Sequence, residues 1–263
     1  MYAFEVSKPS SLDDAAAAIA AGGQALAGGQ TLIPTLKQRL ADPGTLVDLG
    51  GIDTLKGISA SGDTVTVGAM TPHAAVAASA EVKGAIPALA HLAGLIGDAQ
   101  VRNAGTIGGS IANNDPAADY PAAVLGLGAT VMTNKREIAA DDYFQGLFTT
   151  ALDEGEIITA VRFPVPKTAG YAKLEQRASR FALVSVFVAE TASGVRCAVS
   201  GAGAAGVFRC KPLEAALSGG LSVDAVSGVS VPADGLLSDI HAAADYRAAV
   251  IPAIAARAIA AAA

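Results

Sequence analysis

Hydrophobic residues recur with helical spacing in some stretches and alternate with polar residues in others, which predicts a mixture of helices and strands. Near the N-terminus, Ser11 and the acidic residues after it cap a short helix that Gly22 and Gly23 end. The following residues predict a strand at 24–27, a glycine turn at 28–31, a helix at 32–40 and a strand at 45–49. The glycine turn is therefore expected at a helix N-terminus, where backbone amides point outward.

The middle of the chain continues this mixed pattern. Alternation over 55–67 predicts a β-hairpin, and Thr71-Pro72 opens a helix with proline at its first position. The apolar run at 84–95 predicts a helix interrupted by Pro87, and a polar, glycine-bounded segment follows at 97–105. Further expected elements are a helix over 117–127 after Pro116 and strands at 129–133 and 157–163.

The segment from Pro164 to Gly170 is the best domain boundary in the sequence. Beyond it, strands are expected at 171–177 and 195–200, and the segment 184–190 fits either a strand or a helix. Helices are expected at 212–218 and 245–262. This layout predicts an α+β domain in which helices cover a sheet.

Composition favours a globular protein that handles small molecules. The chain has 263 residues, of which 52% are hydrophobic and 16% charged, and its net charge is -6. This balance argues against binding nucleic acid or an anionic membrane surface. The N-terminal residues do not resemble a signal peptide and the apolar runs are too short or interrupted to span a bilayer, so we expect a cytoplasmic protein with no membrane span.

Cysteine and histidine usage disfavours a metal centre in this chain. Cys197 and Cys210 are the only thiols, whereas an iron–sulfur cluster normally needs four ligands. We expect both to be small buried hydrophobic residues in a reducing compartment. His73, His91 and His241 are widely separated and lack metal-ligand spacing, so surface or core positions are the default for each.

The stretch from Thr106 to Asp119 carries most of the chemical information. Two adjacent glycines can accommodate positive φ and let backbone approach a ligand, and Thr106, Ser110, Asn113 and Asn114 offer polar groups. The alternative is an ordinary polar turn before a helix. Neither glycine turn has the G-x-G-x-x-G spacing of a Rossmann fold, and a P-loop lysine motif is absent.

Together, the two glycine turns make the chain similar to the FAD-binding medium subunits of the molybdenum hydroxylase family, such as carbon monoxide dehydrogenase medium chains and the FAD subunits of xanthine dehydrogenases. The resemblance rests on Ala27–Pro34 with Lys37 and Arg39-Leu40, and on Arg102-Asn103, Gly105–Gly109, Ile111–Asn113 and Asp115–Asp119. Further matches are Gly68–His73, Phe181–Val186 and Tyr246-Arg247. These segments occur in the expected order over nearly the whole chain.

The resemblance implies an α+β fold with two subdomains that hold FAD between them, of the vanillyl-alcohol oxidase (PCMH) type, followed by a C-terminal α+β domain of the CO dehydrogenase flavoprotein type. The implied boundaries are 1–54 and 55–165 for the FAD-binding subdomains and 166–263 for the C-terminal domain.

The resemblance also implies roles for individual residues. Backbone amides of 27–31 and 106–110 would surround the pyrophosphate, Asp119 matches a carboxylate that contacts FAD, and Ile158 matches an apolar position beside the flavin. The full set of implied cofactor-binding residues is Ala27, Gly28, Gly29, Gln30, Thr31, Leu32, Thr106, Ile107, Gly108, Gly109, Ser110, Asn113, Asp115, Asp119 and Ile158.

The chain departs from the family pattern at several positions. Gln30-Thr31 replaces a common His-Ser pair, and Ser110 stands where Asn is usual. Glu175 falls where the family often has a basic residue, and Arg180 stands where Asp is common before Phe181. The resemblance therefore assigns no flavin-tuning lysine here.

The function that the resemblance implies is electron transfer within a heteromeric molybdenum hydroxylase. FAD in this chain would receive electrons from [2Fe-2S] clusters of a small partner subunit and pass them to an external acceptor, while a large subunit carries the molybdopterin cofactor, in a dimer of heterotrimers. No side chain of this chain need act as a catalytic acid or base on the organic substrate. The alternatives are a stand-alone flavin oxidase and a structural subunit that has lost FAD. The sequence does not identify the substrate or the electron acceptor.

Overall fold

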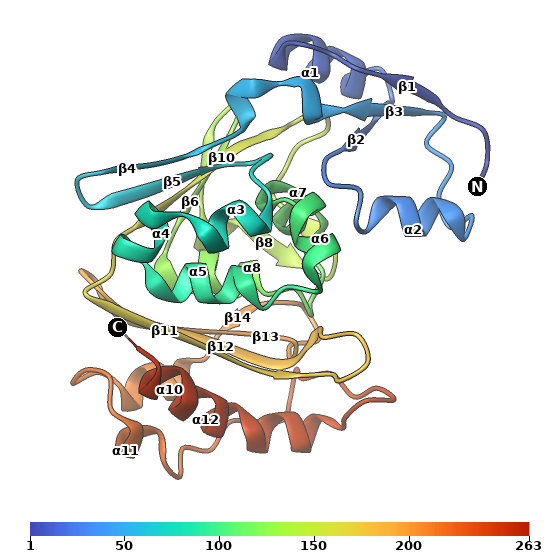
Figure 1. The fold of residues 1–263 in the computed structure, drawn as a ribbon. Coiled ribbons are helices and arrows are strands. Elements are labelled where there is room, and N and C mark those ends of the chain that lie inside the picture. The colour runs from blue at the N-terminus through green and yellow to red at the C-terminus, as the bar shows by residue number, and fades with distance from the viewer. Residues whose placement is uncertain (263) are drawn as a thin grey trace.

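The computed structural model of the chain describes residues 1–262. Figure 1 shows the three larger sheets and their helices arranged as successive layers from the N-terminal to the C-terminal part of the chain. The first sheet has the order β1-β3-β2, with β1 at Glu5–Ser7, β2 at Gln24–Leu26 and β3 at Thr45–Asp48. Both of its strand pairs are parallel. Each crossover is therefore made by a helix, α1 at Leu12–Ala20 and α2 at Leu32–Lys37.

The second sheet is antiparallel and has the order β4-β5-β10-β6-β7. Its central strand, β10, comes late in the sequence and pairs with β5 on one side and β6 on the other. The strands are β4 (Ile58–Ser61), β5 (Thr64–Gly68), β6 (Thr130–Thr133), β7 (Glu137–Ala139) and β10 (Ile158–Pro164).

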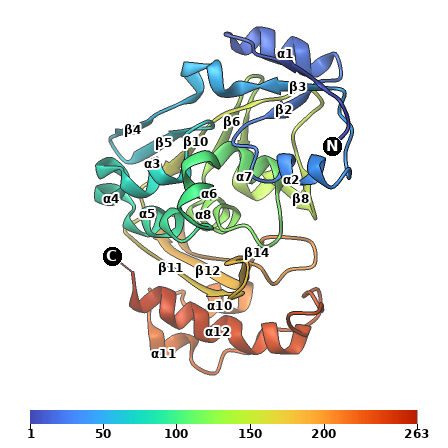
Figure 2. The same ribbon diagram turned by 45° about the vertical axis from the view of Figure 1, so that its right-hand side comes forward.

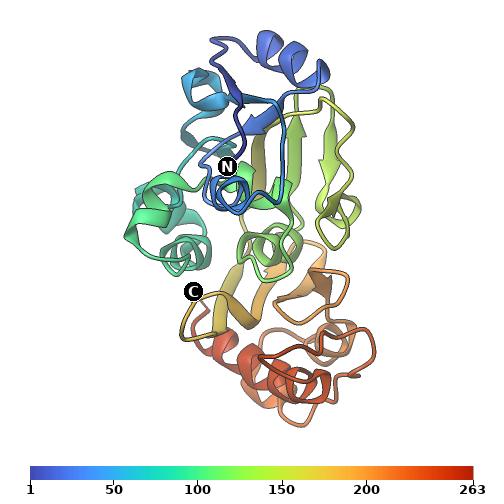
Figure 3. The same ribbon diagram turned by 90° about the vertical axis from the view of Figure 1, so that its right-hand side faces the viewer.

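Most of the helices of the chain's middle part lie on one side of this second sheet, as Figures 1 and 3 show. They are α3 (His73–Ala78), α4 (Ala80–Ala85), α5 (Pro87–Gly94), α6 (Ala99–Ala104), α7 (Ile107–Asn113) and α8 (Tyr120–Leu127). A short helix α9 (Ala140–Tyr143) precedes the small hairpin of β8 (Phe144–Gly146) and β9 (Thr149–Thr150).

The third large sheet is antiparallel with the order β11-β12-β13-β14. Its strands are β11 (Thr168–Glu175), β12 (Ala182–Thr191), β13 (Gly194–Ser200) and β14 (Phe208–Arg209). Helices α10 (Lys211–Ala216), α11 (Val223–Val226) and α12 (Ala244–Ala260) cover the face that points away from the rest of the molecule (Figure 1). The segment 184–190 is therefore strand and not helix.

Helix α8 lies between the second and third sheets and joins them. It contacts β10 on one side and β12 and β13 on the other, and all eight of its residues are buried. A helix that is apolar on all sides is expected in such a position, because no face of it meets water. The inner face of the third sheet, including Tyr171 and Phe187, belongs to the same hydrophobic core as the second sheet.

Several boundaries predicted from the sequence are wrong for identifiable local reasons. The helix expected over 32–40 ends at Lys37, and Arg39 takes φ 59° beyond it. Pro72 is the N-cap of α3 and not its first residue, because its extended backbone pairs with Thr106. The interruption expected at Pro87 is confirmed, because α4 ends at Ala85 and α5 begins at Pro87, but the predicted start at Gly84 is wrong, because α4 begins at Ala80.

The largest error concerns the polar stretch before and within the second glycine motif. Residues 99–104 and 107–113 form helices α6 and α7, where the sequence analysis gave a polar glycine-bounded segment and a glycine turn. Asp98 and Thr106 cap them by accepting hydrogen bonds from Val101 N and Gly109 N. Among the described residues, none of the helices is long and apolar enough to cross a membrane.

Candidate functional site

The second glycine motif is the first turn of helix α7. Thr106 Oγ1 accepts a hydrogen bond from Gly109 N at 3.1 Å, and Asn114, in the left-handed conformation with φ 45°, ends the helix. Gly108 and Gly109 are helical, so the predicted positive φ at this pair is wrong. Gly108 is required for a different reason: a Cβ there would lie 2.6 Å from the Cβ of Ala69.

The first glycine motif is a turn between β2 and α2 that lies directly against the segment leading into α7. Gly29 takes φ 70°, as the turn prediction requires. A Cβ on Gly28 would lie 2.1 Å from the carbonyl oxygen of Ala104 and 2.6 Å from the Cα of Gly105. Only glycine allows the two backbone segments to approach this closely.

The two glycine motifs therefore lie in direct contact with each other. A Cβ on Gly109 would lie 3.4 Å from the Cβ of Ala27, so the start of the first turn faces the first turn of α7. Figures 2 and 3 show α2, which follows the first motif, beside α7 and α6. This junction joins the first sheet and its helices to the helices of the second sheet.

The first turn has backbone N–H groups that are free to donate at this junction. Within the described residues, the amides of 28–32 donate no hydrogen bond to another part of the chain. Five successive N–H groups at a turn form a site suited to an anion. The hydroxyl of Thr31 does not cap α2.

The amides of the second motif are already engaged. Ile107 N donates to Thr71 O, Gly108 N to Ala69 O and Ser110 N to Thr106 O, in addition to the Gly109 N bond to Thr106. The expectation that the amides of 106–110 act in the same way as those of 27–31 is therefore corrected. The second motif instead offers glycines, which let a ligand approach the backbone closely, and the side chains of Thr106, Ser110 and Asn113.

The polar side chains within α7 and just after it divide into two groups. Ser110 and Asn113 are half-buried and make no side-chain hydrogen bond within the described residues. Asn114 is buried and donates through Nδ2 to Gly146 O and Thr149 O, so it anchors the β8–β9 hairpin. Asp115 Oδ1 accepts a hydrogen bond from Ala117 N and shapes the turn into α8.

Asp119 is buried at the N-terminus of α8, with 5% of its surface exposed. Its Oδ1 lies 2.9 Å from Lys173 Nζ and also accepts a hydrogen bond from the Tyr171 hydroxyl. Burial raises the pKa of Asp119, and the Lys173 charge opposes that effect. Sequence reasoning missed both partners, because β11 is distant in sequence and neither residue belongs to the glycine motifs.

Ile158 begins the central strand β10 and is 5% exposed. The neighbouring Thr159 O accepts a hydrogen bond from Ala69 N, and Ala69 is the residue against which Gly108 packs. Ile158 is thus linked to Gly108 of the second motif through two residues, Thr159 and Ala69.

His73 and Tyr120 form a buried polar pair behind the second motif that sequence reasoning did not select as a site. Their ring centroids are 5.2 Å apart, and His73 Nδ1 and the Tyr120 hydroxyl have no hydrogen-bond partner in the described residues. Burial, together with the Arg102 charge, lowers the pKa of His73 to about 4. The ring is therefore neutral near pH 7, and it packs against Gly105.

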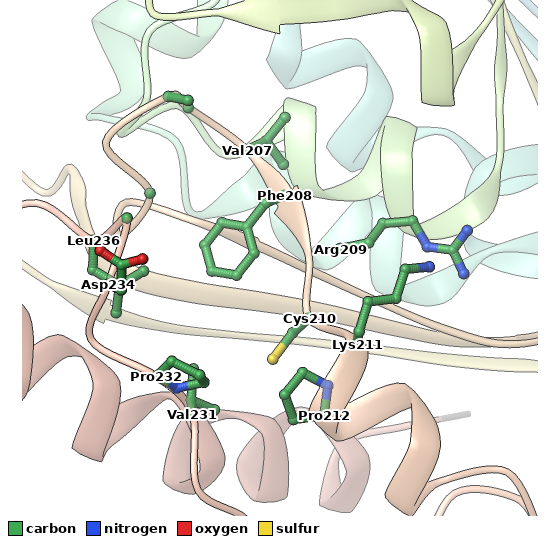
Figure 4. A pocket seen from close by; sticks show the side chains of 14 residues that line it. Val207, Phe208, Arg209, Cys210, Lys211, Pro212, Val231, Pro232, Asp234 and Leu236 are labelled. Carbon is green, nitrogen blue, oxygen red and sulfur yellow. The ribbon is translucent and has the colours of Figure 1, made fainter.

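The remaining candidate features belong to the third sheet and the segments next to it. None of them includes a residue of the two glycine motifs. A hollow of about 330 Å³ lies between the loops 203–212 and 231–236. Figure 4 shows Phe208 and the Cys210 sulfur at this hollow, with Arg209 and Lys211 extending away.

Cys197 and Cys210 are both buried, as expected, and burial raises the pKa of each thiol. Within residues 1–262, no group of three metal-ligating side chains gathers at one place.

Comparison with known proteins assigns the class of protein. Residues 2–166 match the family described as the FAD binding domain in molybdopterin dehydrogenase. The chain belongs to this family and is an FAD-binding medium subunit of the molybdenum hydroxylase type.

Individual relatives share this assignment over most of their length. The chain is 41% identical over 210 residues to the carbon monoxide dehydrogenase medium chain of Afipia carboxidovorans, covering 76% of this chain and 73% of the relative. It is 35% identical to the nicotine 6-hydroxylase medium subunit of Paenarthrobacter nicotinovorans, covering 93% and 92%. Both are similar proteins whose substrates differ.

Solved structures support the same assignment. A chain of the carbon monoxide dehydrogenase from Hydrogenophaga pseudoflava superimposes with a TM-score of 0.88 at 33% identity, covering 99% of this chain and 97% of that one. A chain of quinoline 2-oxidoreductase from Pseudomonas putida 86 gives a TM-score of 0.88 at 29% identity, covering 98% and 96%. The predicted two-subdomain FAD-binding fold followed by an α+β domain is confirmed.

Proposed function

We propose that this chain is the electron-transfer subunit of a heteromeric molybdenum hydroxylase. It takes electrons from [2Fe-2S] clusters of a small partner subunit and delivers them, through bound FAD, to an external acceptor. The large subunit carries the molybdopterin cofactor and the organic substrate, and the assembly is a dimer of heterotrimers. The names of the relatives, a medium chain and a medium subunit, support a small and a large partner.

The observation that carries the proposal is the direct contact of the two glycine motifs. The space that Cβ atoms at Gly28 and Gly108 would need is filled by backbone and by Ala69, while the amides of 28–32 stay available. This arrangement fits a dinucleotide diphosphate, because an anion gains from several convergent N–H donors and needs a close backbone wall.

Within this proposal, most of the predicted cofactor residues have a specific task. Residues 27–32 hold the diphosphate through backbone amides, and Thr106, Ser110 and Asn113 supply hydroxyl and amide groups from the opposite wall. Asp119 contacts a donor group of FAD, and Ile158 lies against its apolar part. FAD, when bound, supplies the redox chemistry, and the chain supplies position, electrostatics and exclusion of water.

The proposed division into subdomains 1–54 and 55–165 and a domain 166–263 is supported by the sheets. The first sheet falls within the first range, the second sheet within the second range, and the third sheet within the last. The junction of the two glycine motifs then lies between the first two ranges.

The cysteine content supports the proposed origin of the electrons. The chain's two cysteines are both buried in the third sheet and its first helix connection, and a cluster needs more thiolates. Iron–sulfur clusters therefore belong to a partner.

The test is to purify the complex and measure extracted FAD by absorbance, together with flavin reduction by substrate under anaerobic conditions. We expect about one FAD per chain, and flavin reduction only when the iron–sulfur subunit is present. An active complex without FAD would support the structural-subunit alternative. Turnover by the isolated FAD-loaded chain would support the stand-alone oxidase.

A further inference from the structure

The chain's two cysteines, Cys197 and Cys210, face each other at the end of the β13–β14 strand pair. The antiparallel register of these strands pairs Ala198 with Arg209, so one further step pairs the two cysteines. Cys210 N donates a hydrogen bond to Cys197 O at 2.8 Å, which shows that the pairing extends to this step. The two residues therefore lie directly opposite each other.

Both thiols lie on one face of the third sheet. Side chains alternate between the faces of a strand, so Cys197 shares its face with Val199, and Cys210 shares its face with Phe208. All four belong to the hydrophobic cluster that this sheet forms with α10, α11 and α12. Opposed residues of an antiparallel pair have Cα atoms about 4.5–5.5 Å apart, within the range of about 4.4–6.8 Å that a disulfide spans. The two sulfurs can therefore be joined without moving a strand.

The two sulfurs differ in their access to small molecules. Cys210 lines the hollow of about 330 Å³, and Figure 4 shows its sulfur directed into that space near Phe208. Cys210 is 1% exposed, which restricts the reaction to small reagents. Cys197 is fully buried and does not line the hollow. A small oxidant therefore reaches Cys210 first, and Cys197 reacts with the sulfur opposite it.

We propose that Cys197 and Cys210 form a reversible redox pair, a modification site for hydrogen peroxide in the C-terminal domain. The Cys210 sulfur attacks one peroxide oxygen, the O–O bond breaks and water leaves, so that Cys210 becomes a sulfenic acid. The Cys197 sulfur then attacks the Cys210 sulfur, the S–O bond breaks, a second water leaves and the disulfide forms. Two thiols are oxidised and one peroxide is reduced to two waters. A dithiol reductant reverses the change and is itself oxidised to a disulfide.

The surroundings of the pair make this reaction slow. Burial raises the pKa of both thiols, and the nearby Glu214 carboxylate acts in the same direction. The thiolate is therefore a minor form near neutral pH, and peroxide reacts more slowly here than with an exposed thiol. Within residues 1–262, no third metal-ligating side chain joins the two sulfurs, so the pair is a dithiol and not a metal centre.

The disulfide would connect β13 to the segment that leads into α10. Cys210 is the N-cap of α10, and Glu214 of that helix already accepts a hydrogen bond from Cys197 N. The new bond closes the loop 198–209, which borders the hollow, and so restricts the unfolded chain. We expect the oxidised protein to be more stable to heat. The inference does not depend on FAD, because no residue of the glycine motifs takes part.

The test is a peptide map of the purified full chain after incubation with hydrogen peroxide and alkylation of the remaining thiols. Trypsin cleaves after Arg209, so the segments 197–209 and 210–247 separate unless a disulfide joins them. We expect the joined segments, at a mass about 2 Da below the sum of the two free ones, because disulfide formation removes two hydrogens. Dithiothreitol should separate them. The melting temperature of the oxidised chain should rise by several degrees and return after reduction.

Two single variants test the order of the reaction. In Cys197→Ala, peroxide should leave a sulfenic acid at Cys210, which dimedone labels. Cys210→Ala should stay unlabelled, because Cys197 does not reach the hollow. Equal labelling of the two variants would overturn the route through the hollow.

The unmodified chain decides the proposal even where a variant fails to fold. Two free thiols after a peroxide treatment that fully oxidises glutathione would overturn the redox pair. Oxidation of either cysteine to a sulfinic acid without joined segments would overturn it as well.

Discussion

Gly28 lies so close to Ala104 that the Cβ of any larger residue would be 2.1 Å from the Ala104 carbonyl oxygen. This contact joins the turn after β2 to the end of α6, and so brings the two glycine motifs together. It follows that the first motif cannot be altered without moving the second.

Gly28→Ala should therefore push the two glycine motifs apart. The clash is with backbone, which cannot move aside cheaply, so we expect a cost of about 1–3 kcal/mol in the free energy of FAD binding. Equilibrium titration of FAD into the FAD-depleted complex measures it. The matched control is Gly84→Ala in α4, where an added Cβ meets nothing within 4 Å. Equal FAD affinity in both variants would contradict the close-approach argument.

Thr106→Val should weaken both α7 and flavin binding. The substitution removes the hydroxyl that accepts the Gly109 N–H, which should cost about 1 kcal/mol of stability. Thr106→Ser keeps the hydroxyl and should restore most of that stability. Thermal unfolding and FAD content of the two variants give the comparison, and indistinguishable Val and Ser proteins would rule out a role for the hydroxyl.

His73 should make the protein less stable in mild acid. Its pKa is lowered from 6.5 to about 4, so the folded state resists a proton that the unfolded chain accepts. The corresponding stability is complete above pH 6.5 and is lost as the pH falls towards 4, by roughly 2–3 kcal/mol. Urea unfolding at a series of pH values should show this slope, and His73→Asn should remove it. His91→Asn, at an exposed position on α5, is the control; an identical slope in His73→Asn and the unmodified protein would contradict the assignment.

Glu156 should act in a separate, more acidic range. Burial would raise the pKa of Glu156, but hydrogen bonds from Arg136, Thr133 and the Asp153 amide outweigh it and lower the value from 4.5 to about 2. The ionised carboxylate therefore stabilises the fold above pH 4.5, and this contribution is lost as the pH falls towards 2. Because Arg136 is partly exposed, we expect only about 1–2 kcal/mol. Unfolding curves of Glu156→Gln between pH 5 and 3 test this, with Glu154→Gln for comparison.

The sequence was sufficient to predict the elements whose signals are local. Ser11 caps α1 by accepting from Asp14 N, and β10 shows the alternation of a half-buried strand. It was also sufficient for the two glycine motifs, because each needs residues of one type at fixed positions. The motifs could be paired only through the family resemblance.

The errors arose where long-range contacts decide the outcome. Two glycines and several polar residues at 106–114 disfavour a helix locally, yet the Thr106 cap and packing of Ile107 and Ile111 in the core stabilise one. The partners of Asp119 lie on β11, and nothing in the spacing of Tyr171 and Lys173 indicates that they reach α8. Side-chain pairs between domains carry no periodic signal.

The central place of β10 in its sheet has a consequence for biosynthesis. Strands β5 and β6 have no common neighbour until residues 158–164 are inserted between them, so a nascent chain that ends before Ile158 cannot close this sheet. The second sheet can therefore be completed only after residues 158–164 have left the ribosome, although β4, β5, β6 and β7 are made much earlier.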